Sequence, residues 1–456
     1  MKIKIIVLAA IALWTTSCKK QNDWLDVKSR KAEVVPTSLK DFRAMLNNTA
    51  IINEFNSALG ILSADNLIVN DQSWAATPTA QLRNAYIWAK DFYNGEASVH
   101  WSRDYYRVFY ANIVLDGLTH IVQTTANQVE FDRVKGTALF YRSLAFYNLA
   151  QIYAEPYVFS KPTSALGVPL RKTSDVNAIV KQSKLNETYT LIIQDLVSAE
   201  KLVGSTVEIK THVSKLAVKS LLARVYLSIQ DYESAKLYSE SVIAESEGLL
   251  DFNSLNAAIP FPIPGLLLNK EMLFYSIIGS TSMVINSRVE PALYKLYAND
   301  DLRRNIFYKD NGATGVSFRG QYTGLAFMYF AGLATNEQYL IAAECNIRNG
   351  QVQKGLQHLN ALLLNRWKKG AFVPLLAANS EEALKLVLEE RRKELPFTAA
   401  TRWDDLKRLN LEPSTSTVLR RFLNGENFVL MPNDKRYVIP IPLEEIRLGG
   451  LIPTER

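Results

Sequence analysis

Apolar side chains recur at every third or fourth position through most of this 456-residue chain. Four runs show the pattern most clearly: Val134, Ala138, Tyr141, Ala145, Leu149 and Ile152; Tyr189, Ile192, Leu196, Ala199 and Val203; Val218, Leu222, Val225 and Ile229; and Val352, Leu356, Leu359 and Leu363. A period of 3.6 residues places such side chains on one face of an α-helix. The sequence therefore predicts a mostly α-helical protein whose helices each bury one face.

Three long stretches lack this helical period. Residues 51–96 mix Asn, Asp, Trp and Tyr, residues 156–181 form a proline-containing connection, and residues 251–333 combine closely spaced prolines with a glycine-spaced segment. We expect each stretch to be a long loop that carries short strands or helices. Ordered loops of this length inside a compact body are usually functional. These stretches are therefore the first place to look for a binding site.

Two segments match when the sequence is shifted by 120 residues. Ala223 falls on Ala343, Leu227 on Ile347, the turn 230–231 on 350–351, Tyr232 on Val352 and Ala235 on Gly355. Each copy is predicted to be a helical hairpin with small residues where its helices cross, which resembles a tetratricopeptide unit. Ala145 and Ala199 are candidates for a third pair, divided by the 156–181 loop. The alternative is a set of generic helical hairpins, which also place alanine at their crossings.

The first residues of the chain resemble an export signal. Lys2 and Lys4 precede an apolar run over 5–14, which is too short to span a bilayer because a spanning helix needs about 20 residues. A basic start, a short apolar core and small residues before a cleavage point are typical of a secretory signal peptide. The sequence therefore predicts that residues 1–17 are a signal peptide.

Cys18 makes this prediction more specific. It follows Thr15-Thr16-Ser17, an arrangement that resembles a bacterial lipobox, in which the cysteine is acylated and becomes the new N-terminus. Several acyl chains would hold the protein on a membrane without a spanning helix, and the polar residues 19–23 would serve as a tether. The alternative is an ordinary signal peptide with a chance cysteine. We favour Cys18 as a lipid anchor.

Composition argues against several other classes of protein. The 52 Lys and Arg against 45 Asp and Glu leave a net charge of +7, which is too dilute over this length to indicate a nucleic-acid partner. Two cysteines, Cys18 and Cys345, cannot build a disulfide framework. The four histidines lie far apart, so no zinc-ligand spacing is present. We expect neither a metal nor a cofactor.

The charged motifs indicate ion pairs rather than catalysis. Glu390 and Glu394 would share one face of a helix within the charged run 389–395, where ion pairing is the favoured interpretation. The same interpretation applies to Asp404 and Asp405, which have arginine neighbours. A glycoside hydrolase needs two carboxylates about 5–10 Å apart across the sugar, and no motif in the chain indicates that geometry. The sequence therefore predicts a protein that is not an enzyme.

An ordered series of segments resembles one known family. After Cys18 come Trp24-Leu25-Asp26-Val27 and then residues 141–149, 167–170, 193–196, 222–227, 299–303 and 336–344. The most specific segment is Glu390-Arg391-Arg392-Lys393-Glu394-Leu395, followed by Arg402-Trp403-Asp404-Asp405-Leu406-Lys407-Arg408, and residues 437–442 close the series. Together they resemble the SusD/RagB family of outer-membrane nutrient-binding lipoproteins over nearly the whole mature chain.

The resemblance implies an architecture and a function. The fold would be mostly α and SusD-like, with tetratricopeptide-like hairpins and long loop-rich insertions in an N-terminal region, 18–250, and a C-terminal region, 251–456. The protein would be a lipoprotein on the exterior of the outer membrane that captures oligosaccharides and delivers them to a TonB-dependent transporter of the SusC kind. The alternatives are a surface lipoprotein glycoside hydrolase and a peptide-binding member of the same family.

Aromatic and polar residues in the loop-rich stretches are the candidate ligand site. A Trp or Tyr ring gives a sugar a flat apolar platform with a polar edge, and nearby carboxylates and amides would orient the hydroxyl groups. In relatives the ligand patch lies on the face away from the repeats. The candidates are Asp65, Asn66, Trp74, Tyr86, Trp88 and Tyr322. The alternative for each aromatic residue is burial in the core.

Overall fold

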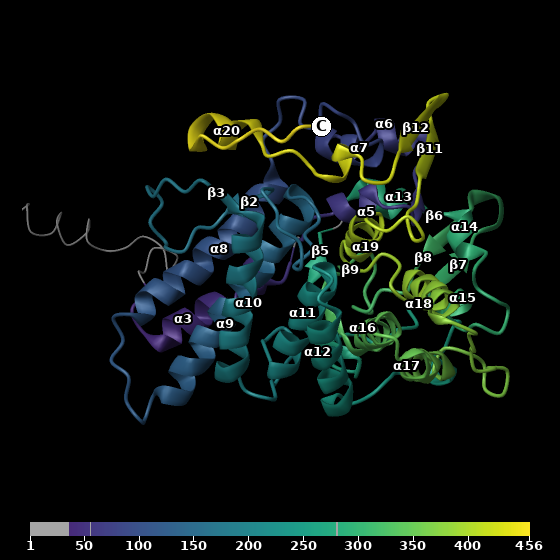
Figure 1. Ribbon diagram of the computed structural model, residues 1–456, viewed down its shortest axis with the longest axis horizontal. Helices are drawn as coiled ribbons and strands as arrows, with labels where there is room; N and C mark the ends of the chain where they lie inside the picture. Colours follow the sequence, from purple (N-terminus) through teal and green to yellow (C-terminus); the bar gives the residue numbers. More distant parts are fainter. Residues whose placement is uncertain (1–35, 55, 280) are drawn as a thin grey trace, which may run out of the picture.

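Three long helices pack side by side in the computed structural model, which describes residues 36–54, 56–279 and 281–456. α9 (Gln128–Tyr153) lies between α8 (Val99–Leu118) and α10 (Leu185–Leu202), and α3 (Leu39–Leu46) packs against α8 and α9 (Figure 1). The six residues of the predicted stripe over 134–152 are at most 4% exposed. The helical period therefore identified buried residues correctly, but the expectation of a single buried face is wrong for α9, because every residue over 138–147 is buried.

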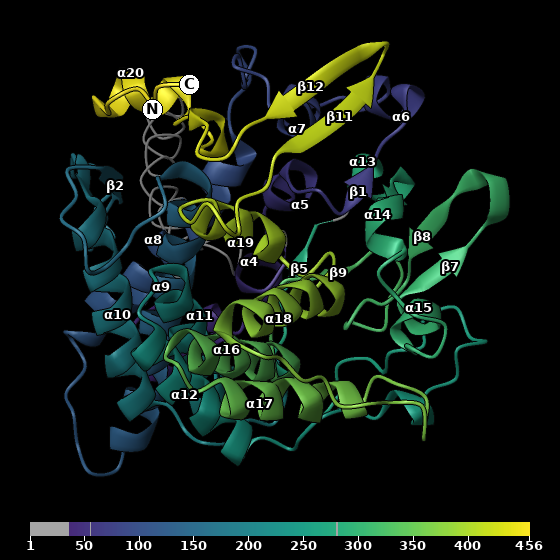
Figure 2. The same ribbon diagram turned by 45° about the vertical axis from the view of Figure 1, so that its right-hand side comes forward.

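Two helical hairpins form the lower part of the molecule in Figures 1 and 2. They consist of α11 (Lys215–Ser228) with α12 (Tyr232–Glu245), and α16 (Thr335–Arg348) with α17 (Val352–Leu364). Adding 120 to the bounds of α11 gives 335–348, which are the bounds of α16. Both turns contain a residue of positive φ, Gln230 at 62° and Gly350 at 79°. The structure confirms the two hairpins and their offset.

A close approach of the two helices explains the glycine in the second hairpin. A Cβ atom at Gly355 would lie 2.5 Å from Cγ1 of Ile347 and 2.7 Å from the carbonyl oxygen of Ala343. Both distances are shorter than a Cβ atom tolerates. The corresponding residue of the first hairpin is Ala235, which is buried. The helices of the second hairpin are therefore closer at this position than an alanine would permit.

The crossing in the first hairpin provides a test of this packing. Ala223 is fully buried in a cluster with Leu227, Ala235 and Ile341. The substitution Ala223→Trp is expected to lower the free energy of unfolding by about 3 kcal/mol or more, because it overpacks a filled core. Thermal melting of the purified variant measures the loss. Leu237→Trp, at a position that is 67% exposed on α12, is the control and should melt like the wild type.

Equal melting temperatures for Ala223→Trp and the wild type would mean that the 223 side chain is not enclosed at a helix crossing. A loss of the same size in Leu237→Trp would instead show that any added tryptophan is destabilising, and the comparison would then say nothing about the crossing.

Short strands connect segments that are distant in the sequence. In the described part of the chain they form six two-stranded antiparallel sheets. Their pairings are β1 (Leu67–Ile68) with β6 (Arg288–Val289), β4 (Met272–Phe274) with β10 (Leu333–Ala334), β5 (Ile277–Ile278) with β9 (Tyr329–Phe330), β2 (Leu166–Pro169) with β3 (Gln182–Lys184), β7 (Tyr308–Asp310) with β8 (Val316–Phe318), and β11 (Leu419–Leu423) with β12 (Glu426–Leu430). The first of these pairs connects residues 67–68 to residues 288–289. The next two connect residues 272–278 to residues 329–334.

Short helices occupy much of the remaining chain. They are α4 (Thr49–Ile52), α5 (Leu59–Ser63), α6 (Asp71–Ala75), α7 (Ala80–Tyr86), α13 (Ser282–Asn286), α14 (Pro291–Tyr294), α15 (Arg303–Ile306) and α20 (Leu443–Gly449). Those from α4 to α15 fall in or beside the stretches without a helical period, as expected, whereas α20 lies outside them. Two further helices follow the second hairpin, α18 (Ser380–Glu394) and α19 (Thr401–Leu409). α18 packs on α16, and α19 packs on α5.

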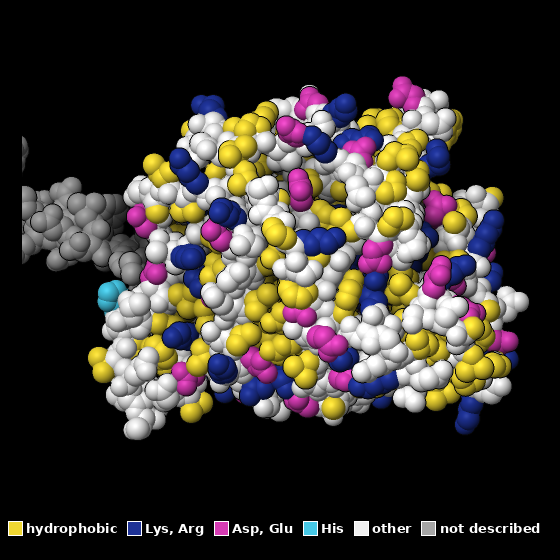
Figure 3. All heavy atoms as spheres, viewed as in Figure 1, with side chains coloured by type: hydrophobic (Ala, Val, Ile, Leu, Met, Phe, Trp, Pro, Cys, Tyr) yellow, Lys and Arg dark blue, Asp and Glu magenta, His cyan; other side chains and the backbone are white. Residues whose placement is uncertain are grey.

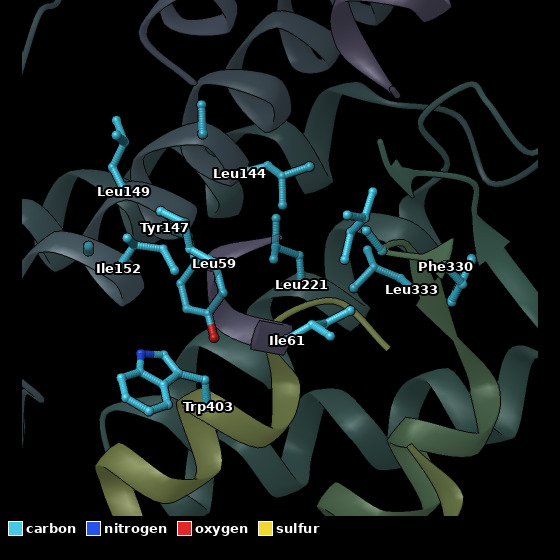
Figure 4. Close-up of a cluster of buried hydrophobic side chains, with 14 of the residues drawn as sticks. Leu59, Ile61, Leu144, Tyr147, Leu149, Ile152, Leu221, Phe330, Leu333 and Trp403 are labelled. Carbon is cyan, nitrogen blue, oxygen red and sulfur yellow. The ribbon is translucent and has the colours of Figure 1, made fainter. Parts of the chain in front are cut away.

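The main core lies where these elements meet. Figure 4 shows side chains from α5, α9, α11 and α19 and from the 330–333 segment in one cluster, with Trp403 of α19 among them. Trp403 is fully buried, and its ring stacks on Tyr437 with centroids 4.7 Å apart. The cluster extends from Phe42 to Leu451 and so draws on both predicted regions. The boundary at residue 250 stays a prediction.

The export signal lies outside the described residues. The predicted signal peptide 1–17, Cys18 and the tether all precede residue 36, where the description of the structure begins. Among the helices of the described residues, none has the length and the apolar character that crossing a membrane requires. The lipid anchor at Cys18 therefore stays a prediction from the sequence.

Candidate ligand-binding groove

A groove with a volume of about 1000 Å³ lies in the loop-rich part of the structure. Residues 418–422 of the β11 hairpin line it together with residues 313–316 near β8, and β1, β6 and α14 contribute further lining residues. Figures 1 and 2 place these elements away from the helical hairpins α11–α12 and α16–α17. This is the face on which the sequence analysis expected a ligand.

The β11–β12 hairpin is held in place at its tip. Its turn is Asn424-Gly425, with φ angles of 50° and 80°, and this dipeptide suits a two-residue turn in which both residues have positive φ. The main-chain N–H of Asn424 donates to Oδ1 of Asp71 at 2.9 Å. The hairpin is thereby attached to α6, and its first strand is aligned with the groove.

Asp65 lines the groove but is neutralised within the protein. Its carboxylate lies 2.7 Å from Nε of Arg402 and 3.2 Å from Nη2 of Arg392. Burial raises the pKa of Asp65, but the two guanidinium groups outweigh this effect and hold the pKa well below its usual range. Asp65 therefore connects α18 and α19 to the groove. Its negative charge is already paired with two arginines, so it contributes little to the binding of a charged ligand.

Tyr86 and Trp88 also line the groove, but their rings are buried, with exposed fractions of 2% and 1%. The hydroxyl of Tyr86 accepts from the N–H of Val69 at 2.9 Å, and Nε1 of Trp88 donates to the carbonyl of Ser63 at 2.9 Å. Both rings contact one guanidinium group. The Cζ atom of Arg421 lies 3.9 Å from the Tyr86 centroid and 4.5 Å from the Trp88 centroid.

Asn66 and Trp74 support the surroundings of the groove. Asn66 is 4% exposed, and its Oδ1 accepts from Nε of Arg392 at 3.1 Å. Trp74 is half-buried on α6, where its Nε1 donates to the carbonyl of Arg83 at 3.1 Å. Neither side chain is among the groove-lining residues.

Tyr322 lies in the core rather than in the groove. It is 5% exposed, and its hydroxyl donates to Oε2 of Glu271 at 2.7 Å and accepts from Nδ2 of Asn336 at 2.8 Å. Glu271 in turn pairs with Arg366 at 2.8 Å. The structure therefore brings Asp65, Tyr86 and Trp88 together at the groove and places Tyr322 in a buried polar network.

The charged runs form buried ion pairs between helices. Arg303 pairs with Glu390 at 2.6 Å and with Glu394 at 3.1 Å, and all three side chains are at most 8% exposed. Asp405 pairs with Arg391 and Arg408, at 2.8 Å each. The interpretation of these carboxylates as ion-pair partners is confirmed, in its inter-helix form.

The same interpretation is wrong for Asp404. Among the described residues its carboxylate has no ion pair within 4.0 Å, and its buried Oδ1 has no hydrogen-bond partner. Burial raises the pKa of Asp404 to about 7, opposed by the nearby Lys407. The sequence pattern failed here because the arginines on α19 pair with other carboxylates, Arg402 with Asp65 in the bend before β1 and Arg408 with Glu344 and Asp405.

Glu344 makes stability depend on acid pH. It is fully buried against Arg408 and Arg348, whose charges outweigh its burial and lower its pKa to about 2 from 4.5. Because the folded pKa is the lower one, this stabilisation is fully present above about pH 4.5 and is lost as the pH falls through about 2. We expect the melting temperature to fall steeply over this range and the Glu344→Gln variant, although less stable at pH 7, to show a shallower slope.

Melting curves between pH 7 and pH 2.5 measure both slopes. Other carboxylates with lowered pKa values, such as Asp65 and Asp301, keep the slope of the variant above zero. Identical slopes in the two proteins would contradict the assignment to Glu344.

The described residues contain no group of three or more His, Cys, Asp or Glu side chains that could hold a metal ion. The groove itself contains two carboxylates, Asp65 and Glu290. With Asp65 fully engaged by two arginines, the groove presents binding chemistry: an apolar and hydrogen-bonding surface with several cations.

Comparison with known families identifies the chain. One family model, described as starch-binding and associating with the outer membrane, matches residues 23–227. A second, described as the SusD family, matches residues 335–451. The chain belongs to the SusD family. The resemblance drawn from the ordered sequence segments is thereby confirmed, and so is the mostly helical SusD fold.

Individual relatives agree with this assignment. The SusD-like protein P2 of Formosa agariphila is 25% identical over 428 residues, which cover 79% of this chain and 80% of that protein. A putative sugar binding protein from Bacteroides vulgatus superposes with a TM-score of 0.71 at 21% identity, covering 92% of this chain and 99% of that one. A SusD superfamily protein from Bacteroides thetaiotaomicron gives a TM-score of 0.72 at 18% identity, over 92% and 100% of the two chains. These superpositions establish the fold.

The residues on β11 of this SusD-family protein were not predicted as site residues from the sequence. Arg420, Arg421 and Phe422 all line the groove, and Phe422 is 68% exposed. The Asn424-Gly425 pair next to them is a strong hairpin signal when alternating apolar residues flank it. This pair predicts the hairpin. It does not predict the side of the molecule on which the hairpin packs.

Proposed function

We propose that this SusD-family protein captures oligosaccharides in the groove and delivers them to a TonB-dependent transporter of the SusC kind. One observation carries the proposal. Phe422, 68% exposed, stands beside hydrogen-bonding side chains at the edge of a groove of about 1000 Å³. Such a volume is at the upper end of the range for small-molecule sites. An aromatic ring next to polar groups offers a sugar both an apolar contact surface and hydrogen-bond partners.

The comparisons support a glycan rather than a peptide as the ligand. The matching family model is described as starch-binding, and one structural relative is described as a putative sugar binding protein. Within the groove we propose that Phe422 and Tyr294 contact the sugar. Asp65, Tyr86 and Trp88 would act by holding the groove cations in place, and Asn66, Trp74 and Tyr322 by supporting its frame.

The proposal also includes the location of the protein in the cell. The outer-membrane association described for the family, together with the lipobox-like Cys18, supports a lipid-anchored protein on the exterior of the outer membrane. The transporter partner is supported by the family resemblance, and the helical hairpins would offer it an extended docking face.

Titration calorimetry with a panel of oligosaccharides tests the groove. For an oligosaccharide that binds, Phe422→Ala is expected to weaken binding by about 1–3 kcal/mol, the range known for aromatic side chains that stack on nucleic-acid bases. The fold should persist because the ring is exposed. Phe159→Ala, at a ring that is 48% exposed outside the groove, is the matched control and should bind like the wild type.

The same titrations separate the alternatives. Binding of peptides but of no oligosaccharide would replace the glycan by a peptide ligand. Shortened oligosaccharides after incubation with the protein would indicate a glycoside hydrolase, since a binding protein leaves the chain length unchanged. Equal affinity of Phe422→Ala and the wild type would remove the groove from consideration.

A further inference from the structure

The charges that line the groove are strongly unequal. Five cationic side chains line it, Arg288, Lys295, Arg392, Arg420 and Arg421, against the two carboxylates Asp65 and Glu290. On the face of the molecule in Figure 3, by contrast, Lys and Arg side chains are interspersed with Asp and Glu. The excess of cations in the groove is therefore larger than on the face that Figure 3 shows.

Contacts within the protein already engage the two carboxylates of the groove, so the excess of available positive charge is larger than the count of side chains indicates. Asp65 is already paired with Arg392 and with Arg402, which is not itself a lining residue. Glu290 caps the first turn of α14, where its Oε1 accepts from the N–H of Ala292 at 3.5 Å. Among the described residues, the other four lining cations have no carboxylate within ion-pair distance. The protein therefore does not neutralise most of the positive charge in its own groove.

Arg421 is the most unusual of these cations because it is 8% exposed and, among the described residues, has no carboxylate within 4.0 Å. Its guanidinium donates to the carbonyls of Tyr86 and Ala64 and lies against the Tyr86 and Trp88 rings. Burial lowers the pKa of Arg421 to about 10, so it stays charged at neutral pH. A buried charge without a partner is costly, and an anion nearby would reduce that cost. Two of its five N–H groups are used in these bonds.

Two further cations lie at the groove with free side chains. Arg420 and Lys295 are exposed, and the side chain of neither donates to another side chain or to a carbonyl in the described residues. Arg288 adds a third cation, whose guanidinium donates to the carbonyls of Thr314, Asn286 and Ser287 and, in the part of the chain that the structure describes, to no carboxylate. Such cations pair most strongly with carboxylate or sulfate groups.

We propose that the groove selects glycans that carry negative charge, as uronate carboxylates or as sulfate esters. This inference rests on the proposed function, since it names the class of oligosaccharide that the groove takes. Phe422 and Ile68, which is 38% exposed, supply apolar contact for the sugar ring beside the cations. Arg421, Arg288, Arg420 and Lys295 meet the charged substituents.

Chemically matched ligands test the selection. An oligogalacturonide is compared with its fully methyl-esterified form, and a carrageenan oligosaccharide with its desulfated form, by titration calorimetry at 50 and 500 mM NaCl. We expect binding of at least one anionic form, at least tenfold weaker binding of its neutral counterpart, and a clear loss of affinity at high salt. The two pairs decide whether the carboxylate or the sulfate is the preferred anion.

The double variant Arg420→Gln/Lys295→Gln tests the groove itself. It is expected to weaken binding of the anionic ligand by about tenfold and binding of the neutral form by a smaller factor. Both side chains are exposed, so the fold should persist. Lys201→Gln/Lys385→Gln removes the same charge from exposed positions on α10 and α18 and should bind like the wild type.

The outcomes separate this inference from the proposed function. Equal or better binding of the neutral forms would overturn the selection for anions and leave glycan capture intact. Undiminished binding of the anionic ligand to Arg420→Gln/Lys295→Gln would also overturn it. Absence of binding to any glycan, neutral or anionic, would overturn both proposals together.

Discussion

Replacing Arg303 by methionine is expected to lower the free energy of unfolding by about 3–5 kcal/mol, because it strips a buried cation from three carboxylates. Arg303 is fully buried and contacts Asp301 at 2.7 Å, Glu390 at 2.6 Å and Glu394 at 3.1 Å. After the substitution, Lys393 and Arg366 are the cationic partners that those carboxylates keep among the described residues. Such a loss is a large share of the 5–15 kcal/mol that stabilises an ordinary protein.

Chemical denaturation of the variant beside the wild type measures the effect. Arg43→Met is the matched control, because Arg43 pairs with Glu130 at 3.1 Å but is 48% exposed. Exposed pairs of this kind contribute less than about 1 kcal/mol. Similar losses in the two variants would show that the Arg303 cluster is not enclosed. Insoluble Arg303→Met beside soluble Arg43→Met would agree with the expected result.

The second large effect is expected on the attachment of the protein to the outer membrane. The variant Cys18→Ala is expected to move the protein from the outer-membrane fraction to the soluble periplasmic fraction, because the acyl chains would be its strongest attachment to the lipid. The experiment is done in cells that lack the proposed partner transporter, so that docking to it cannot retain the protein. Metabolic labelling with a fatty acid that carries an alkyne detects the acyl chains directly.

Cys345→Ala is the matched control for that experiment. Cys345 is the other cysteine in the chain and is fully buried in α16, where its burial raises the pKa of the thiol. The control should stay in the membrane fraction and keep its label. Retention of Cys18→Ala in the outer membrane of cells without the transporter would contradict lipid anchoring at this cysteine.

Buried ion pairs join the C-terminal helices to the rest of the fold. Arg391 and Arg408 connect α18 and α19 through Asp405, and Arg408 continues to Glu344 on α16. At the groove, Arg392 and Arg402 of the same two helices hold Asp65. The helices that carry the most specific sequence segment of the family therefore also support the groove.

Local patterns in the sequence were sufficient for the helices. The period of apolar residues in α9 and the 120-residue offset between α11 and α16 depend on contacts within one helix or one hairpin, so the order of residues along the chain already contains them. The family assignment likewise followed from ordered segments. The ion-pairing interpretation of Glu390 and Glu394 was also correct. A buried carboxylate is costly without a partner, and Arg303, Arg366 and Lys393 supply the partners.

The tertiary structure alone decided which side chains form the groove. Arg421 contacts Tyr86 and Trp88 across more than 330 positions of sequence, and Tyr322 joins a polar network with Glu271 and Asn336. An aromatic residue in a loop has no local period that tells burial from exposure. Whether its ring meets solvent depends on which distant segment packs over it, and here β11 buries Tyr86 and Trp88 and leaves Phe422 exposed.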